Sequence, residues 1–322
     1  MAHEIENMFS VQQVPWHKLG IVVEKSPSIE EAIKLAGLDW EVGLKKLFTP
    51  EGTEVDALAT YRTSDNAILG VVGSSYKPLQ NKDAFNFFNP FLEAKVASLE
   101  TAGSLREGKR IWVLAKINKD PIEIVKGDDI VQYVLLSNSH DGTLAVRVGF
   151  TPVRVVCANT LAMAHGNNAS RLLRVKHTGS VVENLEKIQD IMNVANQQFE
   201  ATAAQYRLLA SKDINQQDLE KYVKKVFAIN KTGIAALTET TEGADSGSRV
   251  LAKIIPLFES GRGNDLPGVK GTLWGAYNAI TEYVQYERGK DESIRLDNTW
   301  FGTGAALNRK ALDTAIEFAQ AD

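Results

Sequence analysis

Two apolar runs joined by a short turn restrict the fold of this chain more than any other feature. Residues 131–139 are rich in β-branched and other apolar side chains, which is typical of a strand. The following Ser139-His140-Asp141-Gly142 has turn chemistry, because glycine accepts a positive φ. Residues 143–157 then alternate between apolar and polar side chains. The pattern predicts a β-hairpin, with an edge position, a bulge or a bend at Pro152.

The charge of the same region differs from that of the rest of the chain. The formal net charge is -4, yet residues 142–182 contain no Asp or Glu. Five cations stand in this window: Arg147, Arg154, Arg171, Arg174 and Lys176. Such a local positive field suits a phosphate backbone or another polyanion. The competing interpretation is that each cation is solvated separately on its own face.

The two arginines of the second strand lie seven positions apart. Arg147 and Arg154 would therefore be on opposite faces of an ideal strand, unless a bulge near Pro152 resets the phase. Further on, Asn159 is expected to cap a short helix over residues 160–165, which Gly166 ends. Residues 171–176 are expected to form a further strand or an extended arm.

Turn residues and capping boxes predict the rest of the chain. Residues 55–63 and 67–73, and residues 99–106 and 109–118, are expected to form two further hairpins. Ser28 and Glu31 form a capping box that opens a helix over residues 29–36, and residues 82–95 predict a helix broken or kinked at Pro90.

After residue 180 the patterns become helical. A second capping box at Ser180 opens a long helix to about residue 209, and helices are expected near 219–227, 249–258, 274–286 and 305–318. Residues 231–248 predict a mobile loop. We therefore expect an α+β fold, with a β-rich region over residues 1–179 followed by a mainly helical region over residues 180–322.

The sequence offers little support for catalysis or for a cofactor. The five histidines show no HxxxH pair, and the single cysteine, Cys157, cannot build a zinc site and fits a buried structural thiol. Asp128, Asp129 and Asp141 could hold Mg²⁺ if they converged. No Walker motif or complete dinucleotide fingerprint is present. We expect no cofactor and no metal, and a protein that acts without catalysis.

Aromatic residues beside cations offer possible stacking surfaces for nucleobases. Lys109 and Arg110 precede Trp112, and Tyr76 precedes a lysine. Trp112 and Phe150 are more typical of a core, whereas Tyr76, flanked by polar residues, favours a surface contact. The predicted nucleic-acid-binding set is Arg147, Arg154, Arg171, Arg174, Lys176, Lys109, Arg110, Tyr76 and Asn159.

Composition bears on where the protein acts. No apolar run is long enough to cross a bilayer, and the first residues lack the apolar region of a signal peptide. One cysteine permits no intramolecular disulfide, which fits a reducing compartment. We expect no membrane partner and a cytoplasmic protein.

Several motifs carry a resemblance that covers nearly the whole chain. They are Pro15-Trp16-His17-Lys18-Leu19-Gly20, Ala36-Gly37-Leu38-Asp39-Trp40 with Val42, Tyr76 with Leu79-Gln80-Asn81, Arg154-Val155-Val156-Cys157-Ala158-Asn159-Thr160-Leu161, and Phe301-Gly302-Thr303-Gly304-Ala305. With these motifs the chain resembles a phage- and plasmid-associated family whose core is domain of unknown function 932. The resemblance implies residence on mobile elements in a bacterial host and no settled activity. The hairpins followed by helix are also remotely similar to phage single-strand annealing proteins of the RecT, Red-beta and Erf types.

Three functions remain open from the sequence. The first is a single-stranded DNA-binding protein that anneals strands and assembles as a homo-oligomeric ring or filament. The second is a metal-dependent nuclease that uses Asp128, Asp129 or Asp141. The third is a structural or protein-interaction factor of a phage.

Overall fold

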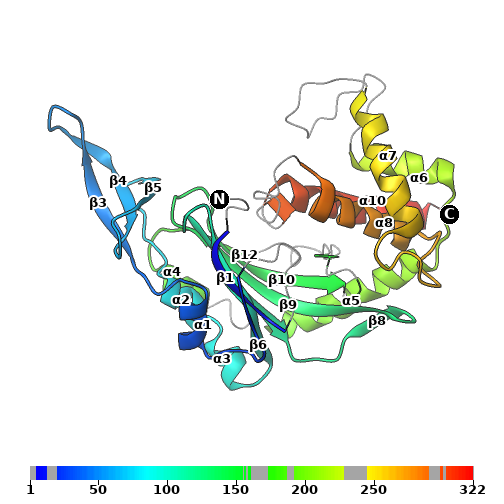
Figure 1. The fold of residues 1–322 in the computed structure, drawn as a ribbon, viewed down its shortest axis with the longest axis horizontal. Coiled ribbons are helices and arrows are strands. Elements are labelled where there is room, and N and C mark those ends of the chain that lie inside the picture. Colours follow the sequence, from blue (N-terminus) through cyan, green and yellow to red (C-terminus); the bar gives the residue numbers. More distant parts are fainter. Residues whose placement is uncertain are drawn as a thin grey trace. The chain divides into compact units, whose positions relative to one another are not determined.

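The chain folds into two compact units that interleave along the sequence. The computed structural model describes residues 5–12, 20–154, 156, 159–160, 173–186, 192–227, 245–289, 298–299 and 302–321. The first unit comprises Met1–Lys119, Tyr133–Phe150 and Arg171–Val194, and the second comprises Asp120–Gln132, Thr151–Ser170 and Ala195–Asp322 (Figure 1). The single boundary that the sequence predicts after residue 179 stays a prediction. Each unit is described by itself below.

Nine of the described strands form one sheet. Its order is β11-β10-β9-β7-β6-β1-β2, with β12 paired to β10 and β8 paired to β9. The strands are β1 (Ile5–Val11), β2 (Ile21–Val23), β6 (Ala97–Leu105), β7 (Arg110–Ile117), β8 (Ile122–Val125), β9 (Asp128–Ser139), β10 (Val146–Arg154), β11 (Asn159–Thr160) and β12 (Leu173–Val175). The predicted hairpins β6–β7 and β9–β10 are thus adjacent in this sheet. The β6–β7 turn contains Gly108, whose φ of +84° favours glycine.

A second sheet of three strands belongs to the first unit. It consists of β3 (Val42–Phe48), β4 (Glu54–Arg62) and β5 (Ile68–Val72) in that order. The hairpin predicted between β4 and β5 is confirmed, and Asp65 Oδ1 accepts a hydrogen bond from the Ala67 amide in its turn. Figure 1 shows β3 and β4 as a long ribbon.

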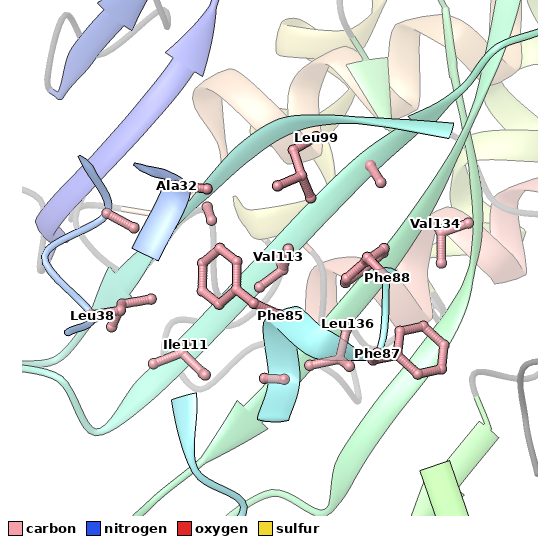
Figure 2. Packing of buried hydrophobic residues seen from close by; sticks show 14 of the residues in the cluster. Ala32, Leu38, Phe85, Phe87, Phe88, Leu99, Ile111, Val113, Val134 and Leu136 are labelled. Atoms are coloured by element: carbon pink, nitrogen blue, oxygen red, sulfur yellow. The ribbon is translucent and has the colours of Figure 1, made fainter. Parts of the chain in front are cut away.

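Three short helices supply apolar side chains to the core of the first unit. They are α1 (Ile29–Leu35), α2 (Asn81–Asn86) and α3 (Asn89–Glu93). The Ser28–Glu31 capping box is present at the start of α1, and Pro90 stands in the first turn of α3, so it separates α3 from α2 as the sequence predicted. Phe85 and Phe88, both fully buried, lie among sheet residues such as Val113 (Figure 2). This packing fixes one face of the sheet as the apolar face.

The helices of the second unit enclose a separate core. They are α5 (Met192–Ala210), α6 (Gln216–Val226), α7 (Asp245–Ser260), α8 (Leu273–Glu282) with the π-helical turn η2 (Tyr283–Glu287), and α10 (Thr303–Gln320), whereas α4 (Val181–Glu186) falls in the first unit. Every residue of α8 is buried, so α8 forms the centre of this core. The fold is α+β, with strands mostly in the first half and helices mostly in the second, as predicted.

Two expectations concern segments that are described only in part. The helix expected over residues 160–165 is wrong at its start, because Asn159 and Thr160 form strand β11 against Arg154 and Val153. The remainder of that segment, and most of the loop expected over 231–248, lie outside the described residues. Among the described helices, none is long and apolar enough to cross a membrane.

Candidate nucleic-acid interface

Two arginines face each other across neighbouring strands of the first unit. In the antiparallel pairing of β10 with β12, Arg147 is opposite Arg174, and Val146 is opposite Val175. Both valines are buried in the apolar core, so the alternation of a strand directs the arginines to the other face. Directly opposite residues have Cβ atoms about 5 Å apart, and like charges at that spacing destabilise a sheet. The register therefore places two cationic side chains close together on one face of the sheet.

Lys176 extends the same group of cations. It follows β12 directly, two positions after Arg174, and both side chains are exposed. Arg147 is half-buried, so its guanidinium is held more closely against the sheet. Long basic side chains of this kind can cover apolar surface with their stems while the charged heads remain in water.

Lys109 and Arg110 are tied to the loop that leads into β10. Arg110 is paired with Ser139 between β7 and β9, and the Lys109 carbonyl accepts a hydrogen bond of 2.7 Å from the His140 amide. Arg110 Nη2 also donates to Thr143 Oγ1 over 3.1 Å. The strand pairing therefore places these two cations next to the 139–143 loop, from which β10 and Arg147 continue. One carboxylate, Asp141, lies in that loop and accepts from Thr143 Oγ1.

Tyr76 does not make the surface contact that the sequence suggested. Its side chain is buried, and its hydroxyl donates to the Ser139 carbonyl over 2.9 Å. Burial, followed by the negative charge of Asp141, raises the pKa of Tyr76 far above its usual value. The physical reason is that the Tyr76 ring is buried and stacks against His177, with centroids 4.6 Å apart, so it is not exposed for stacking with a nucleobase. Trp112, by contrast, lies in the core as predicted.

A pocket lies beside Tyr76 and Lys176 in the first unit. It has a volume of about 240 Å³, and both residues line it together with His177. No spacing in the sequence indicates this pocket, because residues 73–76, 142–145 and 176–178 come together only through the tertiary fold.

His140 lies fully buried in the first unit and is neutral. Asn81 Nδ2 donates to the carbonyls of Leu38 and Trp40, which leaves Asn81 Oδ1 as an acceptor. The His140 Nε2 atom, 2.9 Å from that oxygen, must therefore carry the proton. Burial lowers the pKa of His140 to about 3, with a smaller contribution from His177. This histidine therefore connects the 139–143 loop to the segments that carry Leu38, Trp40 and Asn81.

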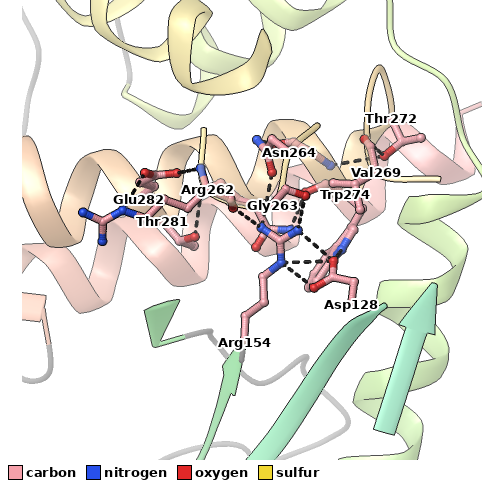
Figure 3. Close-up of polar contacts among 12 residues, drawn as sticks. Asp128, Arg154, Arg262, Gly263, Asn264, Val269, Thr272, Trp274, Thr281 and Glu282 are labelled. Carbon is pink, nitrogen blue, oxygen red and sulfur yellow. Dashed lines mark hydrogen bonds and ion pairs between the residues drawn. The ribbon is translucent and has the colours of Figure 1, made fainter. Parts of the chain in front are cut away.

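Arg154 is a buried structural residue, which corrects its assignment to the cationic surface. Its side chain is fully inaccessible within the second unit, and it forms a bidentate ion pair with Asp128 at 2.7 Å (Figure 3). Its other donors go to the carbonyls of Arg262 and Gly263 and to Asn264 Oδ1. All five guanidinium hydrogens thus have acceptors, and none remains for a phosphate.

The acceptors around Arg154 are themselves fixed by the fold. Trp274 Nε1 donates to Asp128 Oδ2 over 2.8 Å, and Asn264 Nδ2 donates to the carbonyls of Leu257 and Gly275. Gly263 has a φ of +72°, which lets its carbonyl approach the guanidinium closely. Asp128 is therefore occupied by Arg154 and Trp274 rather than available as a metal ligand.

Two further residues of the predicted set remain without a described side chain. Arg171 lies outside the described residues. Asn159, in β11, is placed only by its backbone, which is paired with that of Arg154 in β10. Its interpretation as a helix cap fails because Thr160 continues a strand. Across the described part of the chain, no group of three or more His, Cys, Asp or Glu residues could hold a metal ion.

The geometry defines a two-unit α+β protein with cations gathered along β12 and around the 139–143 loop of its first unit. Residues 68–312, well over half of the chain, match the family described as Domain of unknown function (DUF932). The chain therefore belongs to that family. Neither the curated proteins nor the solved structures contain a match.

Proposed function

We propose that this protein binds single-stranded DNA through the first unit and acts without catalysis, as phage single-strand annealing proteins do. The binding residues are Arg147, Arg174 and Lys176 along β10 and β12, with Lys109 and Arg110 beside the 139–143 loop. The observation that best supports this proposal is the pair Arg147–Arg174. These two like charges lie opposite each other in the antiparallel pairing of β10 with β12. An extended phosphate backbone provides repeated negative charge at such a surface.

The surrounding sequence supports this role. Because residues 142–182 contain no carboxylate, phosphates along β10 and β12 would meet few repelling charges from this segment, and Asp141 stands at its edge. Annealing requires that phosphates be neutralised and bases remain able to pair, and it requires neither a nucleophile nor a metal. The proposed setting is a phage or plasmid in the cytoplasm of a bacterial host.

Assembly into a ring or a filament completes the proposal. The cationic strands β10 and β12 are short, and an annealing protein needs a continuous track for the strand, which repeated head-to-tail copies would supply. Sedimentation with and without single-stranded DNA tests this part. We expect a species larger than a dimer, and a strict monomer under both conditions would contradict annealing.

A titration with single-stranded DNA at several salt concentrations, with and without Mg²⁺, tests the function itself. We expect binding that weakens with salt and no cleavage in either condition. Cleavage that depends on Mg²⁺ would instead support a nuclease, and the absence of both binding and cleavage would favour a role in protein interaction.

A further inference from the structure

The three-stranded sheet of β3, β4 and β5 has one face that the rest of the first unit covers. Gly70 of β5 is paired with Thr60 of β4, which is fully buried. A Cβ at Gly70 would lie 2.5 Å from the Cα atom of Asp141, and one at Gly142 would lie 2.9 Å from a methyl group of Val72. The loop that carries Asp141 and Gly142 therefore lies against this face of the sheet.

The opposite face of the same sheet is apolar and exposed. Direct cross-strand pairs share a face, and every second residue of a strand returns to it. The pairings assign seven residues to this face, which we call the arm face: Lys45, Leu47, Val55, Ala59, Tyr61, Ile68 and Val71. Val55, Ile68 and Val71 are 41%, 55% and 60% exposed. Contiguous apolar side chains in water are typical of an interaction surface.

The arm also has one cation and one anion without an ionic partner. The register of β3 with β4 shifts within the arm, which places Asp56 in a bulge of β4. It precedes Ala59, the residue paired with Lys45, by three positions, or about 10 Å along the strand. Within the part of the chain that the structure describes, the Lys45 ammonium bonds to Asn66 Oδ1 and lies over the Tyr61 ring, and neither Lys45 nor Asp56 has a partner of opposite charge.

We propose that the arm faces of two copies of this chain pack against each other about a two-fold axis. An axis that lies between the two sheets and perpendicular to their strands reverses the direction of β4 in the second copy. Apolar faces packed in this way about 10 Å apart form a core like that of a β-sandwich. The charges of the arm are self-complementary under this symmetry, because Lys45 of each copy meets Asp56 of the other.

One axis satisfies the apolar and the ionic contacts together. Lys45 and Val71 are both paired with Ala59. Asp56 and Val55 precede that residue on β4 by three and four positions. A two-fold axis near the middle of the arm therefore brings Lys45 to Asp56 of the second copy, and Val71 to Val55 of the second copy.

This contact differs from the head-to-tail contact of the proposed ring or filament. A contact between two identical surfaces is isologous and closes at two copies. Its residues lie on the arm, whereas the proposed DNA-binding residues lie on β10 and β12 and beside the 139–143 loop. The arm contact therefore does not depend on DNA binding, and its test remains valid if the protein binds no DNA.

Disulfide cross-linking tests the proposed register. Val55→Cys and Val71→Cys are made separately with Cys157→Ala, which removes the only natural cysteine, and the two proteins are mixed and oxidised mildly. We expect a disulfide-linked dimer that contains one chain of each kind. Val96→Cys, at a position 43% exposed and outside the arm, replaces Val55→Cys in the control and should give no such dimer. Equal yields in the two mixtures would overturn the proposal.

The same two positions cannot cross-link within one copy. Val71 is paired with Ala59, which is four positions from Val55, or about 13 Å along the strand. A disulfide requires Cα atoms within about 7 Å. A chain with both cysteines should therefore also form linked dimers, and only an intramolecular product would contradict the contact.

Exchange of the two charges separates complementarity from a general effect on folding. We expect Lys45→Glu and Asp56→Lys each to weaken the arm contact about tenfold, because each creates two like-charge contacts about the axis. The double variant should restore the cross-linking yield. Glu54→Lys is the matched control, since Glu54 forms an ion pair with Lys46 of its own chain and is paired with Phe48 outside the arm face. Failure of the double variant to restore the yield would overturn the ionic contact.

Val71→Arg distinguishes a second copy from any other occupant of the arm face. Sedimentation without DNA should show particles of half the wild-type mass, because the arm contact joins copies in pairs. The dependence of DNA affinity on salt should stay as in the wild type. An unchanged mass would overturn the proposal, and a lower DNA affinity together with that unchanged mass would assign the arm face to the bound strand instead.

Discussion

Arg154 and Asp128 form a fully buried bidentate ion pair, in which the guanidinium Nε and Nη2 atoms each lie 2.7 Å from a carboxylate oxygen. The pair joins β9 and β10 to the loop that carries Gly263. Because its remaining donors go to carbonyls of that loop and to Asn264, the guanidinium orders a segment that has no regular secondary structure.

Removing either partner should destabilise the second unit severely. We expect Arg154→Ala and Asp128→Asn each to lower the free energy of unfolding by about 3–5 kcal/mol, because a buried charge would lose its partner. Arg154→Lys should not restore stability, since an ammonium lacks the planar fork that serves five acceptors. Urea denaturation measures the effect. Arg174→Ala, an exposed control, should change stability by less than about 0.5 kcal/mol, and equal stability of Arg154→Ala and wild type would refute the structural role.

The cations of the proposed interface should instead affect binding. We expect Arg174→Ala and Lys176→Ala each to flatten the log-log dependence of DNA affinity on salt by about 0.7, as one lost phosphate contact does on a single strand. Lys126→Ala removes an exposed cation from the second unit and should leave the slope unchanged. Salt titrations by fluorescence anisotropy would measure all three. Unchanged slopes in both interface variants would place the DNA elsewhere.

The backbone at Gly263 provides a third test. A Cβ there would come within 2.5 Å of a Val156 methyl group and 3.2 Å of Arg154 Nη2, and the φ of +72° disfavours other residues. We therefore expect Gly263→Ala to destabilise the protein by more than about 1 kcal/mol. Gly52→Ala is the matched control, since Gly52 has a similar φ of +86° and no atom within 4 Å of a Cβ. Equal thermal stability of the two variants would show that the close approach of Val156 and Arg154 to Gly263 does not matter.

Local chemistry explains what the sequence predicted well. The Ser28–Glu31 capping box, the break at Pro90 and the hairpins depend on residues a few positions apart, and the structure contains them. The cross-strand pair Arg147–Arg174 was not predictable as a pair, because its register depends on how β12 returns to β10.

Long-range contacts explain where the sequence misled. Asp128 precedes Arg154 by 26 positions, and the carbonyl of Gly263 follows it by 109, so no local pattern marks this arginine as buried. The same holds for Tyr76, whose hydroxyl meets a carbonyl 63 positions away. The number of charged residues in a segment does not distinguish a buried arginine from an exposed one. The fold determines which arginines are buried.

The neutral, buried His140 should make stability depend on pH. In the unfolded chain a histidine titrates near pH 6.5, whereas the pKa of His140 in the folded protein is about 3. Between these values only the unfolded chain binds the proton, so the free energy of unfolding should fall as pH falls from 6.5, by up to about 1.4 kcal/mol per pH unit. The contribution is fully present above pH 6.5.

His140→Gln removes this titration, and unfolding of both proteins in urea between pH 7 and 5 measures it. Most carboxylates stay ionised in that range, so histidines dominate the change. We expect His140→Gln to be less stable at pH 7, because Gln reproduces the hydrogen bond to Asn81 only in part, but to lose less stability on acidification than the wild type. Some dependence of stability on pH should remain in the variant, since burial also lowers the pKa of His177. An identical slope in the two proteins would mean that His140 is already protonated in the folded state.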